Sequence, residues 1–361
     1  MKMPAELIRE EIRRHRVISF ARFMELALYC PETGYYETNR DNVGCAGDFI
    51  TSVSTGSLFG ELLAFQFAEW LEADVSGRKS EVRIVEAGAH DGKLAADILN
   101  WLEKFRPEVF AKVEYLILEP SPKRQQWQQK TLDNFSNVCW CAGFDDLKLK
   151  TQNSKLQGVF FSNELLDAFP VRRLGWGAKA KNWFEWGVML DGDKFVWSKI
   201  PDFSAAICNP QLEAVLPDNF TVELSPGAEN WWRAAAGILA HEKLIAIDYG
   251  YTAEEQFSPA RPNGTLRAYH RHQMSDDLLA NPGEQDLTAH VNFSSIQNIG
   301  GEAGLKTELF CSQPQFLTQI LGVAVKQNCF PSLDAKQVRQ FQTLTHPEHL
   351  GRAFRVLVQS R

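Results

Sequence analysis

The sequence predicts an α/β fold with a mostly parallel sheet, and two observations support that prediction. Apolar strand candidates alternate with helix candidates over most of the chain, as they do where helical crossovers join parallel strands. Two strands also run directly into polar or glycine residues: Gly158–Phe161 precedes Asn163 and Glu164, and Val82–Glu86 precedes Gly88. Open α/β sheets bind ligands at the carboxyl ends of their strands, so both places are candidate functional sites.

The elements are expected in a simple order. Two helices, roughly Ala5–Arg14 and Ile18–Tyr29, come first, and a glycine-punctuated loop over Pro31–Asp48 precedes a buried helix over Ser57–Leu71. The strand candidates are Val82–Glu86, Glu114–Leu118, Val138–Cys141, Gly158–Phe161, Leu244–Asp248, Lys306–Phe310 and Phe354–Gln359. Helices fill most of the gaps, notably Leu94–Phe105, Pro122–Asn134, Trp231–Ala240 and Phe293–Ala303.

Two segments interrupt this alternation. Arg172–Ser225 contains tryptophans among polar residues and an Asp191-Gly192 turn signal, which predicts a small β-rich insertion. Tyr249–Ala289 is rich in glycine, proline and charge and is longer than a passive loop, which is typical of a lid or a binding segment.

Length and composition indicate a soluble, intracellular, globular protein. The 361 residues, 44% of them hydrophobic, can bury one large core or two smaller ones. A net charge of −7 argues against a broad nucleic-acid-binding surface, and no apolar run is long enough to predict a transmembrane helix. Seven scattered cysteines fit a reducing compartment. The first 16 residues lack an apolar signal core, and their glutamates disfavour a transit peptide.

The turn Gly88-Ala89-His90-Asp91-Gly92 follows a strand that ends in Glu86. Glycine lets the backbone approach a ligand closely, so the turn is a candidate nucleotide site, with a plain strand-to-helix turn as an equal alternative. His90 stands where the dinucleotide fingerprint has its second glycine, which weakens a pyrophosphate-binding interpretation. A smaller adenosine ligand such as S-adenosylmethionine (SAM) suits the turn better.

Two acids after the next strands extend this candidate site. Glu119 ends the second strand, where an acid can accept hydrogen bonds from both ribose hydroxyls; a solvated loop acid is the alternative. Asp145 follows the third strand, where it could lie near an adenine amino group, although a surface position is favoured for it.

The candidate reaction centre is the polar cluster after the fourth strand, Asn163, Glu164 and Asp167. Carboxylates can orient an amine or a guanidinium and accept the proton that it loses on methylation. Asp167 could instead cap the following turn. Asp248 and Tyr249 end the fifth strand and are expected to form another wall of the pocket.

The long segment after Tyr249 contains the loop Gly264–Tyr269, which could close over this site. It also brings together residue types that bind metals: His270, His272, Asp276, Asp277 and His290. Their spacing matches no ordinary zinc pattern, so no metal site is expected.

Several short motifs occur in order along nearly the whole chain: Ile18–Met24, Gly34–Tyr36, Gly47–Ser52, Phe59–Glu61, Asn163-Glu164 with Asp167-Ala168 and Pro170, Ile247–Gly250, Gly264–Tyr269 and Asp286–Phe293. With these motifs the chain resembles the MidA-like family of SAM-dependent methyltransferases. That family includes the mitochondrial complex I assembly factor that is regarded as a protein-arginine methyltransferase.

The resemblance implies a class I methyltransferase fold with a seven-stranded, mostly parallel sheet, an N-terminal helical extension and two insertions. Residues 1–75 would form the extension and a loop that covers the cofactor. Residues 76–361 would form the methyltransferase domain, with insertions at about 172–225 and 250–290. The implied cofactor is SAM.

The residues and the resemblance together assign roles by position. The cofactor would be bound by Gly47, Asp48, Thr51, Glu86, Gly88, Gly92, Glu119 and Asp145; the catalytic residues would be Asn163, Glu164 and Asp167; and the substrate would be bound by Asp248, Tyr249, Arg267, Tyr269 and Asp286. The family's turn usually reads Gly-Pro-Gly-x-Gly, whereas this chain has His90, so its turn must differ or tolerate strain.

The expected function is N-methylation of a protein side chain, with arginine favoured. The alternative is an assembly or interaction protein that keeps the fold without catalysis, which His90 in the turn and the tryptophan-rich insertion both support. Exposed tryptophans of the insertion could anchor its partner. Tryptophans packed inside the insertion are an equal expectation. A nicotinamide-dependent oxidoreductase is disfavoured because the glycine fingerprint is missing. A cytoplasmic location is expected for a bacterial chain, and the mitochondrial matrix for a eukaryotic one.

Overall fold

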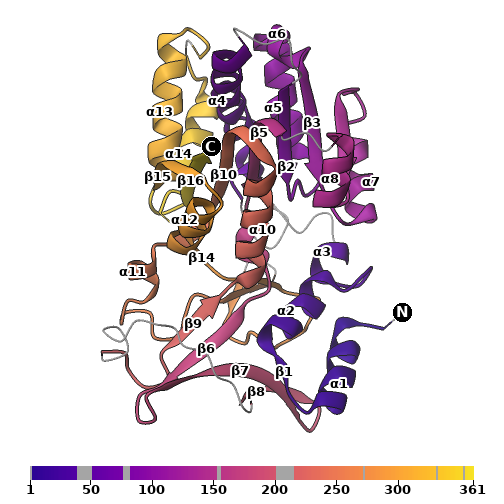
Figure 1. The fold of residues 1–361 in the computed structure, drawn as a ribbon, viewed down its shortest axis with the longest axis vertical. Coiled ribbons are helices and arrows are strands. Elements are labelled where there is room, and N and C mark those ends of the chain that lie inside the picture. The colour runs from indigo at the N-terminus through magenta and orange to yellow at the C-terminus, as the bar shows by residue number, and fades with distance from the viewer. Residues whose placement is uncertain are drawn as a thin grey trace.

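A computed structural model describes residues 2–38, 51–75, 82–152, 156–200, 215–270, 273–330, 332–352 and 354–361. Its centre is a sheet in the order β15-β16-β10-β5-β2-β3-β4 (Figure 1). The strands are β2 (Val82–Ala87), β3 (Val113–Leu118), β4 (Val138–Cys141), β5 (Leu156–Asn163), β10 (Leu239–Tyr251), β15 (Lys306–Ser312) and β16 (Phe354–Ser360). All seven predicted strands are present, and the short β14 (Val291–Asn292) pairs with β10 in addition.

The sheet is mostly parallel, as predicted. The neighbours from β4 through β3, β2 and β5 to β10 all pair in parallel, whereas β16 is antiparallel to both β10 and β15. The strands are apolar on both faces because helices cover both. Phe161 packs into the core on one face of β5, and its neighbour Phe160 packs into the core on the other.

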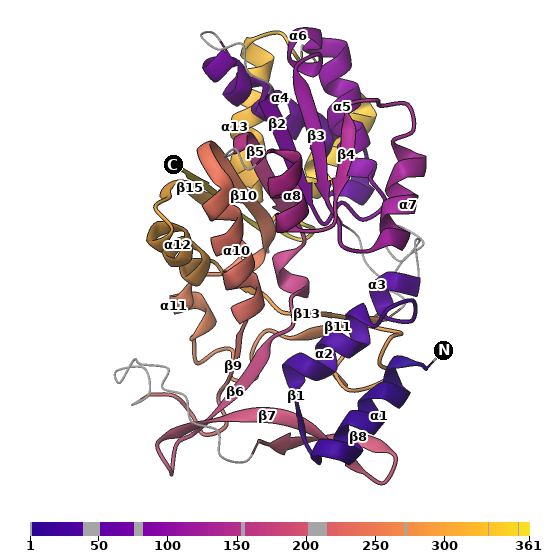
Figure 2. The same cartoon turned by 45° about the vertical axis from the view of Figure 1, so that its right-hand side comes forward.

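One face of the sheet packs mainly against α4 (Leu58–Val75), α5 (Lys93–Phe105), α13 (Gln313–Lys326) and α14 (Ala335–Thr345), with α6 (Pro107–Phe110) beside α5. The opposite face packs against α8 (Phe144–Lys150), α10 (Pro226–Ile238) and α12 (Phe293–Glu302) (Figure 2). Helix α7 (Pro122–Thr131) follows β3, and α11 (Ala253–Gln256) follows β10. No described helix is long and apolar enough to cross a membrane.

A second sheet lies below the carboxyl ends of the central strands in Figure 1. It consists of β1 (Ile18–Ser19), β6 (Arg172–Gly177), β7 (Asn182–Asp191), β8 (Lys194–Lys199) and β9 (Thr221–Leu224), and α1 (Pro4–His15) and α2 (Phe20–Tyr29) pack on it. The predicted β-rich insertion therefore supplies four of the five strands. Most of its tryptophans pack within the insertion or against α2. Trp176 and Trp183 are buried, and the Trp197 ring lies 5.1 Å from that of Phe20.

The segment expected as a long loop contains a third, small sheet. Its strands are β11 (Arg267–His270), β12 (Gln273–Ser275) and β13 (Asp286–Thr288), in the order β12-β11-β13. The loop expectation failed because strands of three or four residues leave little periodicity in the sequence. The helical turns α3 (Tyr35–Thr38), η1 (Val53–Thr55) and η2 (Leu166–Ala168) complete the described elements.

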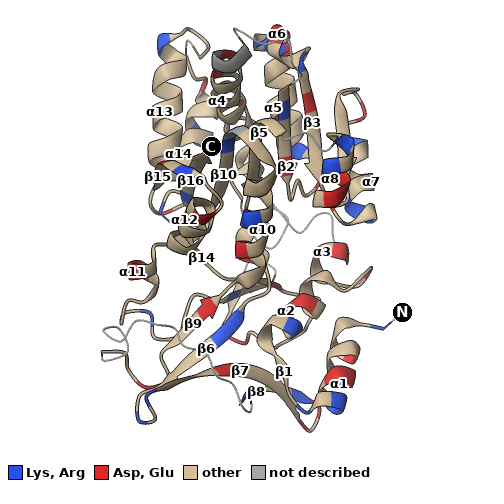
Figure 3. Cartoon of the chain, viewed as in Figure 1, with Lys and Arg blue, Asp and Glu red and all other residues tan. Residues whose placement is uncertain are grey.

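In α1 and α8 an acidic side chain lies in the first turn and basic side chains lie in the last, as Figure 3 shows for α8, which is the arrangement that the helix dipole favours. For the domain division we propose one refinement of the sequence-based boundary at residue 75. Helix α4 belongs to the core of the central sheet, whereas α1 and α2 pack on the second sheet, so the extension is better ended before Leu58.

The close approach of β5 to β2 generates a stability prediction. A Cβ placed on Gly158 would lie 1.9 Å from the carbonyl oxygen of Arg83, and the φ of Gly158 is +136°. Gly158→Ala should therefore lower the free energy of unfolding by about 3 kcal/mol or more. Gly322 lies at an exposed position in the middle of α13, and no atom lies within 4 Å of the place that a Cβ would take. Gly322→Ala should therefore raise the free energy of unfolding by about 0.5–1 kcal/mol. Urea denaturation of both variants measures the contrast, and equal effects would contradict the strand packing.

Candidate active site

A cavity of about 1000 Å³ lies at the carboxyl ends of the central strands. Its described lining includes the residues that follow β2, β3, β4 and β5, together with Tyr249 at the end of β10. Helix α2, η1, β11 and β13 close it from the other side. Parallel strands bring these separate segments to one edge, as the sequence predicted.

The glycine turn after β2 forms one wall of the cavity. Gly88 has a φ of +77°, and a Cβ there would lie 2.9 Å from Leu165 Cδ1, so only glycine fits without displacing that side chain. His90 takes a φ of +47°, which confirms that this turn holds a non-glycine residue in the left-handed region. Glu86 lines the cavity and accepts a 2.6 Å hydrogen bond from the Tyr115 hydroxyl, and burial raises its pKa to about 7.

Glu119 lies at the adjacent strand end and also lines the cavity. Its side chain is buried, yet both oxygens have donors. Oε1 receives the Ser121 backbone N–H at 2.9 Å and lies 3.1 Å from Arg124, and Oε2 receives Gln128 Nε2 at 3.2 Å. Burial raises the pKa of Glu119, and the Arg124 guanidinium opposes that rise.

Two residues assigned to the cofactor do not line the cavity. Asp145 is almost fully exposed and pairs with Lys148 at 3.1 Å, because it starts an amphipathic helix whose buried face carries Leu147 instead. Its neighbours Gly143 and Phe144 line the cavity in its place. Gly92 begins α5 with a φ of +85° and packs against α7, behind the wall.

The residues of the N-terminal motif are placed only in part. Gly47 and Asp48 lie outside the described residues. Thr51 is buried and lines the cavity, and the next residue, Ser52, donates its backbone N–H to Glu164 Oε1 at 3.3 Å. The segment around Thr51 therefore contacts the predicted reaction centre directly.

The reaction centre predicted after β5 is brought together. Asn163, Glu164 and Asp167 all line the cavity. Glu164 has a φ of +52°, an uncommon conformation for a non-glycine residue that is held where its backbone N–H reaches Ile247 O at 2.9 Å. Its Oε1 accepts from Asn163 Nδ2 at 3.2 Å, whereas its Oε2 and Asn163 Oδ1 are buried without a partner in the described part of the chain.

Burial and neighbouring acids raise the pKa values in this cluster. The pKa of Glu164 rises to about 8, chiefly through burial and then through Asp248. Burial, followed by Asp248 and Asp286, raises the pKa of Asp167 well above its ordinary value. These carboxyl groups are therefore poised to hold protons near neutral pH.

Asp248 has a different place from the one predicted. It does not line the cavity. Its carboxylate accepts the backbone N–H groups of Leu165 at 3.1 Å, Leu166 at 2.8 Å and Tyr249 at 2.8 Å, and so fixes the turn that presents Asp167. Burial raises its pKa to about 7. A strand-end acid can point outward to ligand or back to backbone, and the sequence does not distinguish the two.

The third sheet contributes the other predicted substrate residues. Arg267, Tyr269 and Asp286 line the cavity from β11 and β13, and Tyr249 lines it from β10. Asp286 accepts a 2.7 Å hydrogen bond from the Tyr36 hydroxyl. Of the metal candidates, His272 lies outside the described residues, and His270 contacts the carbonyl of Glu284.

Sequence reasoning missed several residues of the cavity wall, among them three large aromatic ones. Tyr29 and Tyr36 line it from the N-terminal helices, and Tyr29 donates to the carbonyl of Ala168 at 2.8 Å. Trp231 lines it from α10, with its ring 5.8 Å from that of Phe144. Only Tyr36 had a signal, the Gly-Tyr-Tyr motif; the tryptophan was indistinguishable from a core residue.

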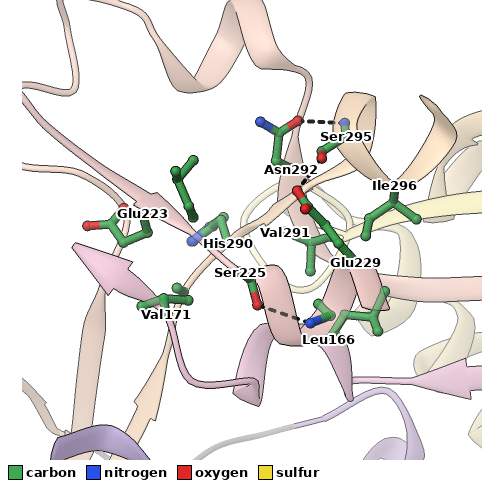
Figure 4. Close-up of a pocket in the computed structure, with 13 residues that line it drawn as sticks. Leu166, Val171, Glu223, Ser225, Glu229, His290, Val291, Asn292, Ser295 and Ile296 are labelled. Atoms are coloured by element: carbon green, nitrogen blue, oxygen red, sulfur yellow. Dashed lines mark hydrogen bonds between the residues drawn. The ribbon is translucent and has the colours of Figure 1, made fainter. Parts of the chain in front are cut away.

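A second cavity of about 60 Å³ lies behind this site (Figure 4). The first turns of α10 and α12 line it, and their caps are already satisfied: Ser225 accepts from Ala228 N at 3.4 Å and Asn292 from Ser295 N at 3.0 Å. His290 lines both cavities, and burial lowers its pKa to about 4. The second cavity has room for water but not for a nucleoside.

The raised pKa of Glu164 generates a pH prediction. Between about pH 4.5 and 8 the folded state keeps a proton that the unfolded chain has lost, so the free energy of unfolding should fall as pH rises through this range. Glu164→Gln removes this titration and should gain about 2 kcal/mol or more over wild type between pH 5 and pH 8. Denaturation at both pH values measures this gain, with exposed Asp145→Asn as control. A constant difference between variant and wild type would contradict the burial of Glu164.

Comparison with known proteins agrees with this geometry. Residues 62–311 match the family described as "Putative S-adenosyl-L-methionine-dependent methyltransferase". The protein arginine methyltransferase NDUFAF7 of Danio rerio is 28% identical over 370 residues, which cover 93% of this chain and 82% of that relative. The Drosophila melanogaster homologue is 27% identical and covers 98% of this chain and 84% of its own length. Both relatives are named mitochondrial.

A solved structure resembles the whole chain. It is a Burkholderia thailandensis protein bound to S-adenosyl-homocysteine, with 30% identity, a TM-score of 0.85, and coverage of 99% of this chain and 92% of that one. More than half of the chain matches this one family, and the fold and the cavity described above agree with that match. The chain belongs to the family of SAM-dependent methyltransferases.

Proposed function

We propose that this protein methylates an arginine side chain of a protein substrate. One observation supports this most: buried carboxyl groups share a cavity with the glycine turn and Glu119, and Glu164 Oε2 among them has no partner in the described residues. A buried acceptor without a donor implies that a ligand supplies one. The arginine methyltransferase names of the relatives agree with a guanidinium as that ligand.

The residues fit SAM as cofactor. Gly88 lines the cavity with backbone in a left-handed conformation, at a φ of +77°, and Glu119 offers a buried carboxylate at the neighbouring strand end. Thr51, Glu86 and Phe144 complete this half of the wall. When bound, SAM supplies an activated methyl group, so that an N–CH₃ bond forms as the S–CH₃ bond breaks.

The acceptor half fits a guanidinium. Its pKa exceeds about 12, so it arrives as a cation with five N–H donors and no acceptor. Glu164 and Asp167 would hold it by charge-assisted hydrogen bonds, and the cation would favour their ionised forms. After transfer, the nitrogen loses one proton, and Glu164 Oε2 is positioned to take it.

A non-catalytic assembly role has lost its main support. That hypothesis relied on exposed tryptophans in the insertion as anchors for a partner. Trp176 and Trp183 are buried, and Trp197 packs against Phe20 and beneath Arg173. These residues stabilise the insertion and its contact with α2.

For the compartment we propose a reducing one, either the bacterial cytoplasm or the mitochondrial matrix. The five described cysteines are all free. The curated relatives are named mitochondrial, and the solved structure is bacterial.

Asp167→Asn tests the catalytic assignment. The variant should lose about 100-fold of its methyl-transfer rate, because a neutral amide cannot make the charge-assisted hydrogen bonds that hold the guanidinium in line with the methyl group. Its affinity for S-adenosylhomocysteine should stay within about twofold of wild type. The assay uses tritiated SAM and proteins extracted from cells that lack this protein, with hydrolysis of the product to identify the methylated amino acid.

Asp145→Asn is the matched control, because that carboxylate is outside the cavity, and it should behave as wild type. Label in methylarginine would support the proposed acceptor. Label in another amino acid would refute arginine specificity, and loss of S-adenosylhomocysteine binding by Asp167→Asn would refute the placement of Asp167 on the acceptor side.

A further inference from the structure

We propose that Gln128 is the positioning residue of the cofactor half of the site. It lies on α7, is fully buried and does not belong to the described lining of the cavity. It can therefore affect a bound cofactor only through its neighbours. This inference rests on the placement of the cofactor proposed above.

The Gln128 amide forms hydrogen bonds with three segments that are separate in the sequence. Its Nε2 donates to the carbonyl of His90 at 3.1 Å and to Glu119 Oε2 at 3.2 Å, and its Oε1 accepts from Trp140 Nε1 at 3.0 Å. One side chain thus connects the turn after β2, the acid after β3 and strand β4.

The three partners permit only one orientation of the amide. An indole N–H can only donate, so it must face Oε1. A carbonyl oxygen and a carboxylate can only accept, so both must face Nε2. Because no rotation of the amide satisfies the set in another way, Gln128 fixes the distance between the His90 turn and Glu119.

This arrangement explains how the turn tolerates His90. A residue with a Cβ at a φ of +47° carries backbone strain of about 1 kcal/mol or more. The hydrogen bond from Gln128 to the carbonyl of His90 holds the strained peptide in place. Gly92, at the end of the same turn, packs on the backbone of Gln128, since a Cβ there would lie 3.3 Å from Gln128 Cα.

A second hydrogen bond from the same amide nitrogen orients Glu119, the acid proposed to face the cofactor. Oε1 of Glu119 is held by Ser121 and Arg124, whereas Oε2 has Gln128 as its one donor in the described part of the chain. Without Gln128 that oxygen would be free to rotate away from the ligand, and the carboxylate would lose a donor that favours its ionised form.

Gln128→Met and Gln128→Glu test this role. Methionine keeps the length but removes both donors, and glutamate keeps the shape but turns an acceptor toward Glu119 and His90. Titration calorimetry with S-adenosylhomocysteine should show about tenfold weaker binding for the methionine variant and a larger loss for the glutamate variant. The KM for SAM should rise in parallel, with kcat within about twofold of wild type.

Gln359→Met is a closely matched control. Gln359 is also fully buried, accepts from Trp232 Nε1 at 2.8 Å and donates to Gln297 O at 3.1 Å and Thr307 Oγ1 at 3.0 Å, but it lies away from the cavity. The Gln359→Met variant should have a lower melting temperature than wild type and an unchanged affinity for S-adenosylhomocysteine.

The outcomes separate the possible failures. Equal affinity in wild type and Gln128→Glu, with both folded, would show that only the shape of Gln128 matters and would overturn the proposal. Glu119→Ala is measured alongside. If it binds S-adenosylhomocysteine as wild type does, the proposed cofactor placement itself is wrong; if it loses binding and the Gln128 variants do not, only this inference fails.

Discussion

The burial of carboxyl groups at the carboxyl end of the central sheet is the constraint on which the rest of the structure depends. No lysine or arginine of the described residues is among the main influences on the pKa of Glu164, Asp167 or Asp248. The structure stabilises these groups with backbone N–H donors instead, and their pKa values are raised. Because these carboxyl groups have no cationic partner among the described residues, the site favours a cationic ligand.

The rest of the fold holds that cluster in place from several directions. Asp248 fixes the turn after β5, and the N-terminal segment reaches the cluster through Ser52. The small third sheet adds Asp286, which Tyr36 anchors from α3. Residues separated by up to 250 positions in sequence are thus neighbours, and the insertion at about 250–290 supplies Arg267, Tyr269 and Asp286 to the cavity wall.

The sequence predicted the central sheet well because its strands are short apolar runs with clear ends. It also predicted the cluster at Asn163, Glu164 and Asp167, since residues after parallel strands must meet at one edge. It could not predict which strand-end acids face the ligand. Asp145 and Asp248 occupy equivalent places in the pattern, yet one points to solvent and the other back to the backbone.

Other features had no local signal at all. Gln128 lies in a polar helix segment where one glutamine looks like the next, and its role arises only when three strand ends and α7 come together. The strands of the third sheet are too short to show a period, and β11 pairs with residues of β13 that are about 20 positions away. Tertiary contacts, rather than sequence patterns, decide these parts of the site.

The central claim is that one cavity holds the cofactor beside the buried acids. A crystal structure of the protein with S-adenosylhomocysteine tests it most directly. The account predicts the ribose hydroxyls on Glu119 and the sulfur facing Glu164 and Asp167. A ligand bound elsewhere, or one whose sulfur points away from these acids, would contradict it.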